Sequence, residues 1–316
     1  MINKRRAFIC GIKGKKLSKK EITFLKSYKP WGIILFSRNI ETIKQTQSLT
    51  NHIKKIFNDN KYPIMIDEEG GKVTRLKNFI DNSSFAARFF GNLYKKDINK
   101  FNLYLDVYIK QTSYLLNLLG INLNAAPVLD VWRKKSHKII GNRSYSLDSK
   151  IVSKIGDIFI DKFRKNRIAS IIKHIPGHGL ANVDSHFHLP IINRSYDYLK
   201  NNDFFPFKNK KVIFAMTAHI LFKKQDPINC VTHSKKMISI IRNKIGFNNL
   251  IISDDISMKS LKHSISVNTS MAFTAGCNLV LHCNGNLREM ITVAKNSPKL
   301  DKFILKKTSQ FRDIIS

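Results

Sequence analysis

The chain has 316 residues, of which 43% are hydrophobic and 10% aromatic, so it can bury a sizeable core, and wholesale disorder is excluded. Its 55 Lys and Arg residues outnumber its 22 Asp and Glu residues, which leaves a formal net charge of +33. Because the basic residues are scattered in ones and twos from Lys4 to Lys307, without a basic arm or zinc-finger spacing, we interpret the charge as a compositional bias and predict no specific nucleic-acid partner.

Short apolar runs rich in β-branched and aromatic residues are predicted to form strands. In chain order they are residues 7–12, 31–36, 62–67, 121–129, 169–175, 212–219, 249–254 and 278–283. Between them, Ile, Leu, Val and Phe recur with helical spacing in segments such as 41–57, 101–119, 148–166, 234–245 and 286–294. This alternation predicts an α/β protein, and eight such units favour one (β/α)8 TIM barrel domain over residues 1–316.

Polar residues stand where several of the predicted strands end. These residues are Asp67, Lys173, His174, His219, Asp254, Cys283 and Asn284. In a TIM barrel, the active-site groups lie at the carboxyl ends of the strands and in the loops that follow them. We therefore expect the functional site at this end of the barrel.

The segment after the third predicted strand contains a carboxylate, a glycine pair and an arginine, namely Asp67, Gly70–Gly71 and Arg75. An acceptor and a fork of donors at one barrel mouth suit a polyhydroxylated substrate, although a solvated turn with a surface ion pair fits the same residues. A second segment, 141–145, carries Arg143 and a tyrosine after a glycine, and on its own it is typical of a surface loop.

Residues 173–188 hold four of the ten histidines together with a proline and two glycines, which predicts an irregular loop over the barrel mouth. Asp184 and His186 are two residues apart, so in an extended loop their side chains share a face. A carboxylate beside an imidazole fixes its tautomer, as a general acid/base requires. The alternative is a metal site, and its candidate ligands are His174, His178, Asp184, His186 and His188.

The seventh predicted strand delivers two adjacent carboxylates, Asp254 and Asp255, after an apolar run. Burying carboxylates is costly unless they are used, and because side chains alternate along a strand, at most one of the two points into the site. We interpret one of them as a nucleophile or an electrostatic anchor. The other possibility, an N-cap for the following helix, fits Asp255 or Ser257 better than Asp254.

Cysteine spacing and apolar run length indicate the compartment. The four cysteines lack CxxC spacing, so neither a disulfide framework nor a structural zinc cluster is predicted. The apolar stretch 7–12 is shorter than a signal-peptide core and runs into lysines, and no run approaches the ~18–20 residues of a membrane span. We expect a cytoplasmic protein with no membrane partner.

Taken together, these segments form a recognisable set. The motifs DEEGGKVTRL, GNRSY, KHIPGHG followed by DSH, MTAH, SDDISM and AGCNLVLHCN occur in this order, and the likeness that they carry covers roughly residues 5–290. They resemble the motifs of the bacterial β-N-acetylhexosaminidases of glycoside hydrolase family 3, cytoplasmic enzymes of peptidoglycan recycling. The resemblance implies a single-domain TIM barrel and an exo-acting, retaining hydrolase. Its expected substrate is β-linked N-acetylglucosamine at the non-reducing end of fragments that contain 1,6-anhydro-N-acetylmuramic acid.

The resemblance also implies roles for individual residues. Asp254 matches the nucleophile that forms the covalent glycosyl-enzyme, and His186 matches the general acid/base, with Asp184 as its orienting partner. The residues that match sugar contacts are Asp67, Arg75, Arg143, Lys173 and His174, with His219 as a further contact. The expected enzyme is a monomer that acts on a small carbohydrate and needs neither a cofactor nor a metal.

Two departures from the family pattern are visible, and neither falls on an expected catalytic group. Lys72 stands where an arginine is usual, and Thr217 stands where a proline is frequent. Two other functions fit parts of the sequence: a metal-dependent hydrolase built on the histidine-rich loop, and a binding protein without activity. The presence of Asp184, His186 and Asp254 together argues against the second of these.

Overall fold

The computed structural model describes residues 2–133 and 140–316. Its centre is a closed barrel of parallel strands in the order β1-β10-β9-β7-β5-β4-β3-β2. The strands are β1 (Arg6–Gly11), β2 (Pro30–Leu35), β3 (Ile64–Ile66), β4 (Leu123–Asn124), β5 (Ala169–Ile175), β7 (Phe214–Thr217), β9 (Leu250–Asp255) and β10 (Leu279–His282). Each predicted strand overlaps one of these, so the (β/α)8 barrel prediction is confirmed.

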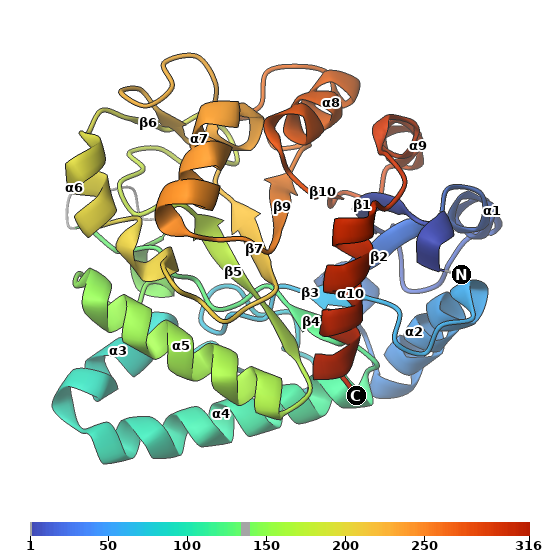
Figure 1. The fold of residues 1–316 in the computed structure, drawn as a ribbon. Helices are drawn as coiled ribbons and strands as arrows, with labels where there is room; N and C mark the ends of the chain where they lie inside the picture. The colour runs from blue at the N-terminus through green and yellow to red at the C-terminus, as the bar shows by residue number, and fades with distance from the viewer. Residues whose placement is uncertain (1, 134–139) are drawn as a thin grey trace.

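Helices surround the barrel (Figure 1). They are α1 (Lys19–Tyr28), α2 (Ile43–Phe57), α3 (Ala87–Lys96), α4 (Ile98–Leu118), α5 (Ser149–Lys165), α6 (Tyr196–Asn201), α7 (Lys235–Ile240), α8 (Ile265–Ala275), α9 (Leu287–Asn296) and α10 (Lys302–Ile314). Within residues 2–133 and 140–316, no helix combines the length and the apolar character that a bilayer span needs.

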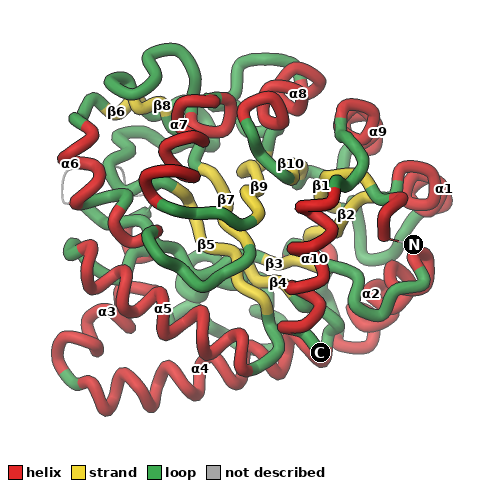
Figure 2. The backbone as a smooth tube through the Cα atoms, viewed as in Figure 1, coloured by secondary structure: helices red, strands yellow, loops and turns green. Residues whose placement is uncertain are grey.

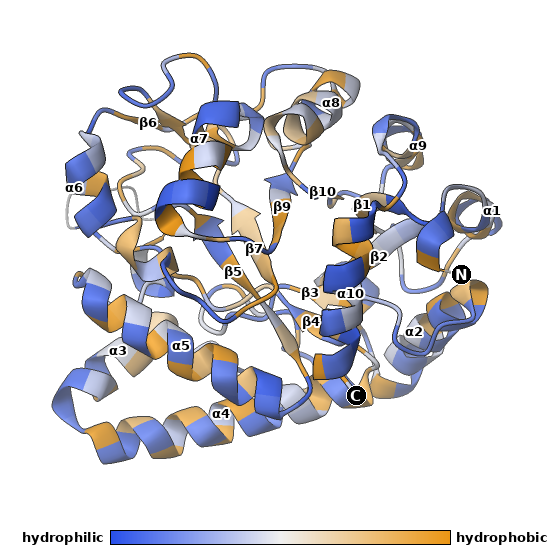
Figure 3. Ribbon diagram, viewed as in Figure 1, coloured by the Kyte–Doolittle hydropathy of each residue, from blue (hydrophilic) through white to orange (hydrophobic). Residues whose placement is uncertain are grey.

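Side-chain alternation along the strands builds two layers of core. In β1, Phe8 and Cys10 point outward into the layer between strands and helices, whereas Ala7 and Ile9 point into the barrel. Both layers are buried, which explains why the strands read as continuous apolar runs. On the outer side the helices are amphipathic, and Figure 3 shows hydrophilic and hydrophobic residues alternating along α4 and α5.

Local signals fix where the helices begin and end. At the start of α1, the Ser18 side chain accepts a hydrogen bond from the backbone N–H of Glu21, and the Glu21 carboxylate accepts one from the backbone N–H of Ser18. Gly276 directly follows α8, and its φ of 114° is a left-handed conformation that glycine adopts without steric cost.

Three elements differ from the sequence prediction. The predicted strand 121–129 is regular only at Leu123–Asn124, because Pro127 has no N–H to donate to a ladder. The predicted helix 234–245 divides into α7 and a π-helical turn at Ile241–Ile245. A separate pair of short strands, β6 (Ile191–Ile192) and β8 (Leu221–Phe222), was not predicted, and Figure 2 shows it beside α6 and α7.

Candidate active site

A pocket of about 360 Å³ opens at the carboxyl ends of the barrel strands, within the size range of small-molecule sites. Its lining combines charged and polar side chains with a few apolar ones. The residues are Asp67, Glu69, Lys72, Val73, Arg75, Arg143, Lys173, His174, His178, Ser185, His186, Met216, Asp254, Leu281 and Cys283. Met216 and Leu281 also belong to the core inside the barrel, so the pocket lies directly above that core.

Four charged side chains form a neutral cluster in the pocket. Arg143 donates two hydrogen bonds to Glu69, Nε to Oε2 at 2.7 Å and Nη2 to Oε1 at 2.8 Å. Lys173 Nζ lies 2.5 Å from Glu69 Oε1 and 2.8 Å from Asp67 Oδ1. Burial alone would raise the pKa of Glu69, but Arg143 and Lys173 hold it well below its ordinary value. Glu69 therefore stays charged, and the cluster presents fixed donors and acceptors to a ligand with hydroxyl groups.

The loop between β3 and α3 is shaped by Glu68. This buried carboxylate accepts hydrogen bonds from the Thr74 hydroxyl, the Asn82 amide and the backbone N–H groups of Arg75 and Leu76. Gly70 has a φ of 80°, and a Cβ atom there would lie 2.4 Å from the carbonyl oxygen of Phe85, so only glycine fits. Glu68 thus organises the loop, while its neighbour Glu69 faces the pocket.

Arg75 lies at the edge of the pocket. Its Nη2 is 3.9 Å from Asp67 Oδ2, and its guanidinium lies 5.5 Å from the centre of the Phe36 ring. Arg38 stacks on the same ring at 4.6 Å and donates from Nε to the carbonyl oxygen of Ile12 at 3.0 Å. The two arginines make this edge of the site cationic, and the Phe36 ring packs against both guanidinium groups.

Asp130, which follows β4, holds two histidines. Its Oδ2 lies 2.6 Å from His174 Nδ1, and its Oδ1 accepts the backbone N–H groups of His174 at 3.2 Å and His178 at 2.7 Å. Burial alone would raise the pKa of Asp130, but the two histidines lower it, so the carboxylate stays ionised. Asp130 does not line the pocket. It holds the ring of His174 and the backbone of His178, and both of these residues line the pocket.

The histidine-rich loop brings Asp184 and His186 together. Asp184 Oδ1 accepts the backbone N–H of His186 and lies 2.8 Å from its ring Nδ1. The His186 side chain is 58% exposed and lines the pocket, whereas Asp184 stands behind it at 22% exposure. With Nδ1 engaged, the other ring nitrogen, Nε2, is left to exchange a proton with a ligand.

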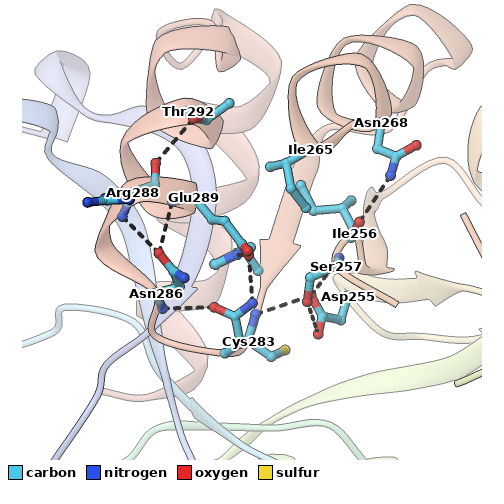
Figure 4. Close-up of polar contacts among 12 residues, drawn as sticks. Asp255, Ile256, Ser257, Ile265, Asn268, Cys283, Asn286, Arg288, Glu289 and Thr292 are labelled. Carbon is cyan, nitrogen blue, oxygen red and sulfur yellow. Dashed lines mark hydrogen bonds and ion pairs between the residues drawn. The ribbon is translucent and has the colours of Figure 1, made fainter. Parts of the chain in front are cut away.

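The two carboxylates at the end of β9 have different surroundings. Asp254 lines the pocket, and its Oδ1 accepts the backbone N–H of Asp255 at 2.8 Å. Asp255 turns away: its carboxylate accepts hydrogen bonds from Ser257 and from the backbone N–H of Cys283 (Figure 4). Asp255 therefore ties the end of β9 to the end of β10, and Asp254 alone faces the site.

Burial alone would raise the pKa of Asp254, but His174, the backbone N–H of Asp255 and the Lys173 ammonium hold it below its ordinary value. A carboxylate with a lowered pKa is ionised at neutral pH. Asp254 can therefore act as a nucleophile or stabilise a developing positive charge.

His219 was expected to contact the sugar, but it is fully buried and does not line the pocket. Burial lowers its pKa, so the ring is neutral. Its Nε2 lies 3.0 Å from the carbonyl oxygen of Asp255, which can only accept, so Nδ1 accepts from the Thr232 hydroxyl at 2.7 Å. The Thr217 hydroxyl lies 2.8 Å from Thr232 Oγ1 and accepts the N–H of Asp254 at 3.4 Å. His219 thus supports the backbone behind Asp254.

The structure brings most of the predicted residues to one pocket. Those on its wall are Asp67, Arg75, Arg143, Lys173, His174, His186 and Asp254. Sequence reasoning missed Glu69, Asp130 and the pocket position of Met216, and it considered His178 only as a metal ligand. Asp130 and Met216 had a usable signal, since each is close to the end of a predicted strand. Nothing in the sequence separated Glu69 from the adjacent Glu68.

The five candidate metal ligands do not converge. His174 is paired with Asp130, His186 with Asp184, and His188 is exposed. Across the part of the chain that the structure describes, no group of three or more His, Cys, Asp or Glu side chains is placed to hold a metal ion.

Comparison with known proteins places the chain in a family. The model of the glycosyl hydrolase family 3 N-terminal domain matches residues 6–306. The β-hexosaminidase of Actinobacillus pleuropneumoniae serotype 3 is 33% identical over 285 residues, which cover 86% of this chain and 79% of the relative. The β-hexosaminidase of Haemophilus ducreyi is 33% identical over 288 residues, 87% of this chain and 80% of the relative.

Solved structures agree. NagZ from Neisseria gonorrhoeae in complex with N-trifluoroacetyl-D-glucosamine matches with a TM-score of 0.87 and 29% identity, over 98% of this chain and 90% of the other. The same protein in complex with a zinc ion matches with a TM-score of 0.85 and 27% identity, over 97% and 90%. The chain therefore belongs to glycosyl hydrolase family 3, among its β-N-acetylhexosaminidases.

Proposed function

We propose that this β-N-acetylhexosaminidase is an exo-acting, retaining β-N-acetylglucosaminidase of peptidoglycan recycling. Its substrates are fragments in which a non-reducing terminal N-acetylglucosamine is β-linked to 1,6-anhydro-N-acetylmuramic acid, with or without a peptide. It acts as a cytoplasmic monomer without a cofactor. The observation that carries the proposal is that Asp254 and His186, with Asp184 behind it, face one pocket whose wall is rich in hydroxyl-binding groups.

The mechanism is a double displacement. In the first step, His186 protonates the glycosidic oxygen while Asp254 attacks the anomeric carbon, so the aglycone leaves as an alcohol and a covalent glycosyl-enzyme forms. In the second step, the same imidazole takes a proton from water, and the water displaces Asp254 with overall retention. The lowered pKa of Asp254 supports its role, because a nucleophile has to be ionised before it attacks.

The charged cluster supports the recognition of one terminal sugar. Asp67, Glu69, Arg143 and Lys173 hold one another in place, so they can bind hydroxyl groups without reorganising. His174, held by Asp130, adds a further contact. Likeness to curated β-hexosaminidases and to NagZ bound to a glucosamine derivative supports the substrate class.

The decisive measurement compares a chromogenic β-N-acetylglucosaminide with the matching β-glucoside. We expect turnover of the first and little of the second. The natural substrate is then tested with the N-acetylglucosaminyl-anhydromuramic acid disaccharide, from which chromatography detects the free sugar and NMR reads the anomer that forms first. Equal turnover of both glycosides, or a first-formed α product, contradicts the proposal.

A further inference from the structure

The middle residue of the Asp184–Ser185–His186 segment is anchored differently from its neighbours. Ser185 is only 4% exposed, although the side chains on either side are 22% and 58% exposed. Its Oγ lies 2.9 Å from Nε2 of His178, which is itself buried. The loop therefore exposes the His186 side chain to solvent, while a buried hydrogen bond between Ser185 and His178 holds its backbone against the barrel.

His178 is a firm anchor because it is held by the barrel. Its backbone N–H donates to Asp130 Oδ1 at 2.7 Å, and its ring centre lies 5.3 Å from that of His174. Asp130 is fully buried and also holds His174. The Asp130 carboxylate therefore holds His174 directly. It also holds the loop indirectly, through His178 and Ser185.

From this connection we infer that His178 and Ser185 are positioning residues: their hydrogen bond holds the loop so that His186 stands over Asp254 and the bound sugar. The inference rests on the proposed role of His186 as the general acid/base. Ser185 lies between Asp184 and His186 in the chain. Loss of its hydrogen bond to His178 would therefore let Asp184 and His186 move together. A displacement of about 1 Å at a proton-transfer group is enough to slow a reaction substantially.

The charge state of His178 suits a constant anchor. Burial, with the neighbouring His174, lowers the pKa of His178 to about 4, so the ring is neutral between pH 5 and 8. The hydrogen bond to Ser185 therefore has the same form across the range in which such an enzyme works. Lowering the pH toward 6 therefore leaves this bond in place.

The loop also has a second, exposed attachment, which provides a matched comparison. The backbone N–H of Lys259 donates to the carbonyl oxygen of His186 at 3.3 Å, and the Lys259 ammonium lies 5.7 Å from the centre of the Phe187 ring. Water competes for both contacts, so they contribute less than a buried hydrogen bond. Phe187→Ala tests the exposed attachment, and His188→Ala controls for mutation of the loop itself.

The test uses two β-N-acetylglucosaminides, one with a nitrophenol and one with a sugar-alcohol leaving group. Ser185→Ala and His178→Ala should each lower kcat/KM about 10–100-fold for the poor leaving group and much less for the nitrophenol. The double variant should be no slower than the slower single variant, because all three lack the same hydrogen bond. Phe187→Ala and His188→Ala should change either rate by less than threefold.

Two results would overturn the inference, and a third concerns the function itself. Equal losses for both leaving groups in Ser185→Ala indicate a general structural role, as do losses that multiply in the double variant. Thermal melting of each variant confirms that it is folded at the assay temperature. If His186→Ala itself shows no dependence on the leaving group, then the proposed acid/base role has failed. If His186→Ala shows that dependence and Ser185→Ala does not, only the positioning role has failed.

Discussion

The two ends of the barrel use charge in different ways. At the amino-terminal end, Asp59 accepts Arg5 Nη2 at 2.7 Å and Arg312 Nη1 at 2.9 and 3.0 Å, and Arg5 is only 3% exposed. This arrangement joins the segment before β1 to α10, and no part of it lines the active-site pocket. At the carboxyl-terminal end, paired charges line the pocket, and His186 reaches solvent.

The packing beneath the charges differs as well. α10 closes the amino-terminal end with an aromatic cluster: Trp31, at the start of β2, packs against Phe214 and Phe311 and donates from Nε1 to the Thr308 hydroxyl at 2.9 Å. Among the residues that the structure describes, no comparable aromatic cluster fills the other end, where the pocket lies above Met216 and Leu281. The comparison teaches that one end serves stability and the other chemistry, and mutations can test the division.

The largest effect is expected from Asp254→Ala. Without the carboxylate no glycosyl-enzyme can form, so kcat should fall by ~10⁴-fold or more. The melting temperature should change little, because the side chain is only half-buried and faces the pocket. A mechanism-based fluorosugar followed by peptide mass spectrometry should label Asp254 in the unmodified enzyme. Labelling of Asp255 or Glu68 would overturn the assignment.

His186→Ala should be next in size and should depend on the leaving group. For a sugar-alcohol leaving group, the loss of the proton donor should slow the glycosylation step about 10²–10⁴-fold. For a nitrophenolate leaving group, the same step should slow much less. The base for the second step is also lost, so the covalent intermediate should accumulate, and added azide should speed its breakdown.

Asp184→Asn should give a milder version of this pattern, since it removes the orienting carboxylate and leaves the imidazole. Identical losses for both leaving groups in His186→Ala, with no response to azide, would contradict the acid/base role.

Exhaustive chelation should leave the activity of the unmodified enzyme unchanged. Loss of activity on chelation would support the metal alternative instead.

Asp59→Ala should behave in the opposite way to the active-site variants: it should lower the unfolding free energy and change kcat little. Removing the carboxylate leaves the buried Arg5 without its counter-ion, which should cost about 3–5 kcal/mol of unfolding free energy. Urea denaturation measures this loss, and kcat measured well below the melting temperature should stay within twofold. A large fall in kcat at a temperature where the variant is folded would show that the two ends are coupled.

The same ion pairs predict how stability depends on pH. Burial alone would raise the pKa of Asp59, but hydrogen bonds and charges from Arg5 and Arg312 lower it overall. Since the folded-state pKa lies below the unfolded value of ~3.9, the contribution is fully present above about pH 5 and is lost as the pH falls through the folded-state pKa. The unfolding free energy of Asp59→Ala should therefore fall less between pH 5 and 3 than that of the unmodified enzyme.

The sequence predicted the barrel because its strands are buried on both faces and separated by amphipathic helices, and both patterns are local. It also predicted which strand ends carry chemistry, since Asp67, Lys173 and Asp254 interrupt apolar runs. It could not separate Glu69 from Glu68, because the loop after β3 decides which of them faces the pocket.

Long-range side-chain contacts also escaped the sequence reasoning. His219 follows a strand end as the sugar-contact candidates do, but Thr232 and the Asp255 carbonyl hold both of its ring nitrogens away from the pocket. The Asp130–His178 contact spans 48 residues and lies after a strand that Pro127 cuts short. Such pairings depend on how the loops close over the barrel, which periodicity does not describe.

The smallest effect is expected just beneath the mouth, from Thr217→Val. Valine keeps the shape of threonine but removes the hydroxyl that accepts the Asp254 N–H and contacts Thr232, so Asp254 should be held less firmly. One such hydrogen bond is worth about 0.5–1.5 kcal/mol, which corresponds to roughly a two- to tenfold fall in kcat if it acts on the nucleophile. The matched control is Ser253→Ala, because Ser253 is buried in β9 next to Asp254 and its hydroxyl accepts the N–H of Leu281 instead. The control should lose stability and keep its kcat. A similar fall in kcat for both variants would mean that the effect of Thr217→Val is not specific to its contact with Asp254. Thr217 would then belong to the part of the barrel that serves stability.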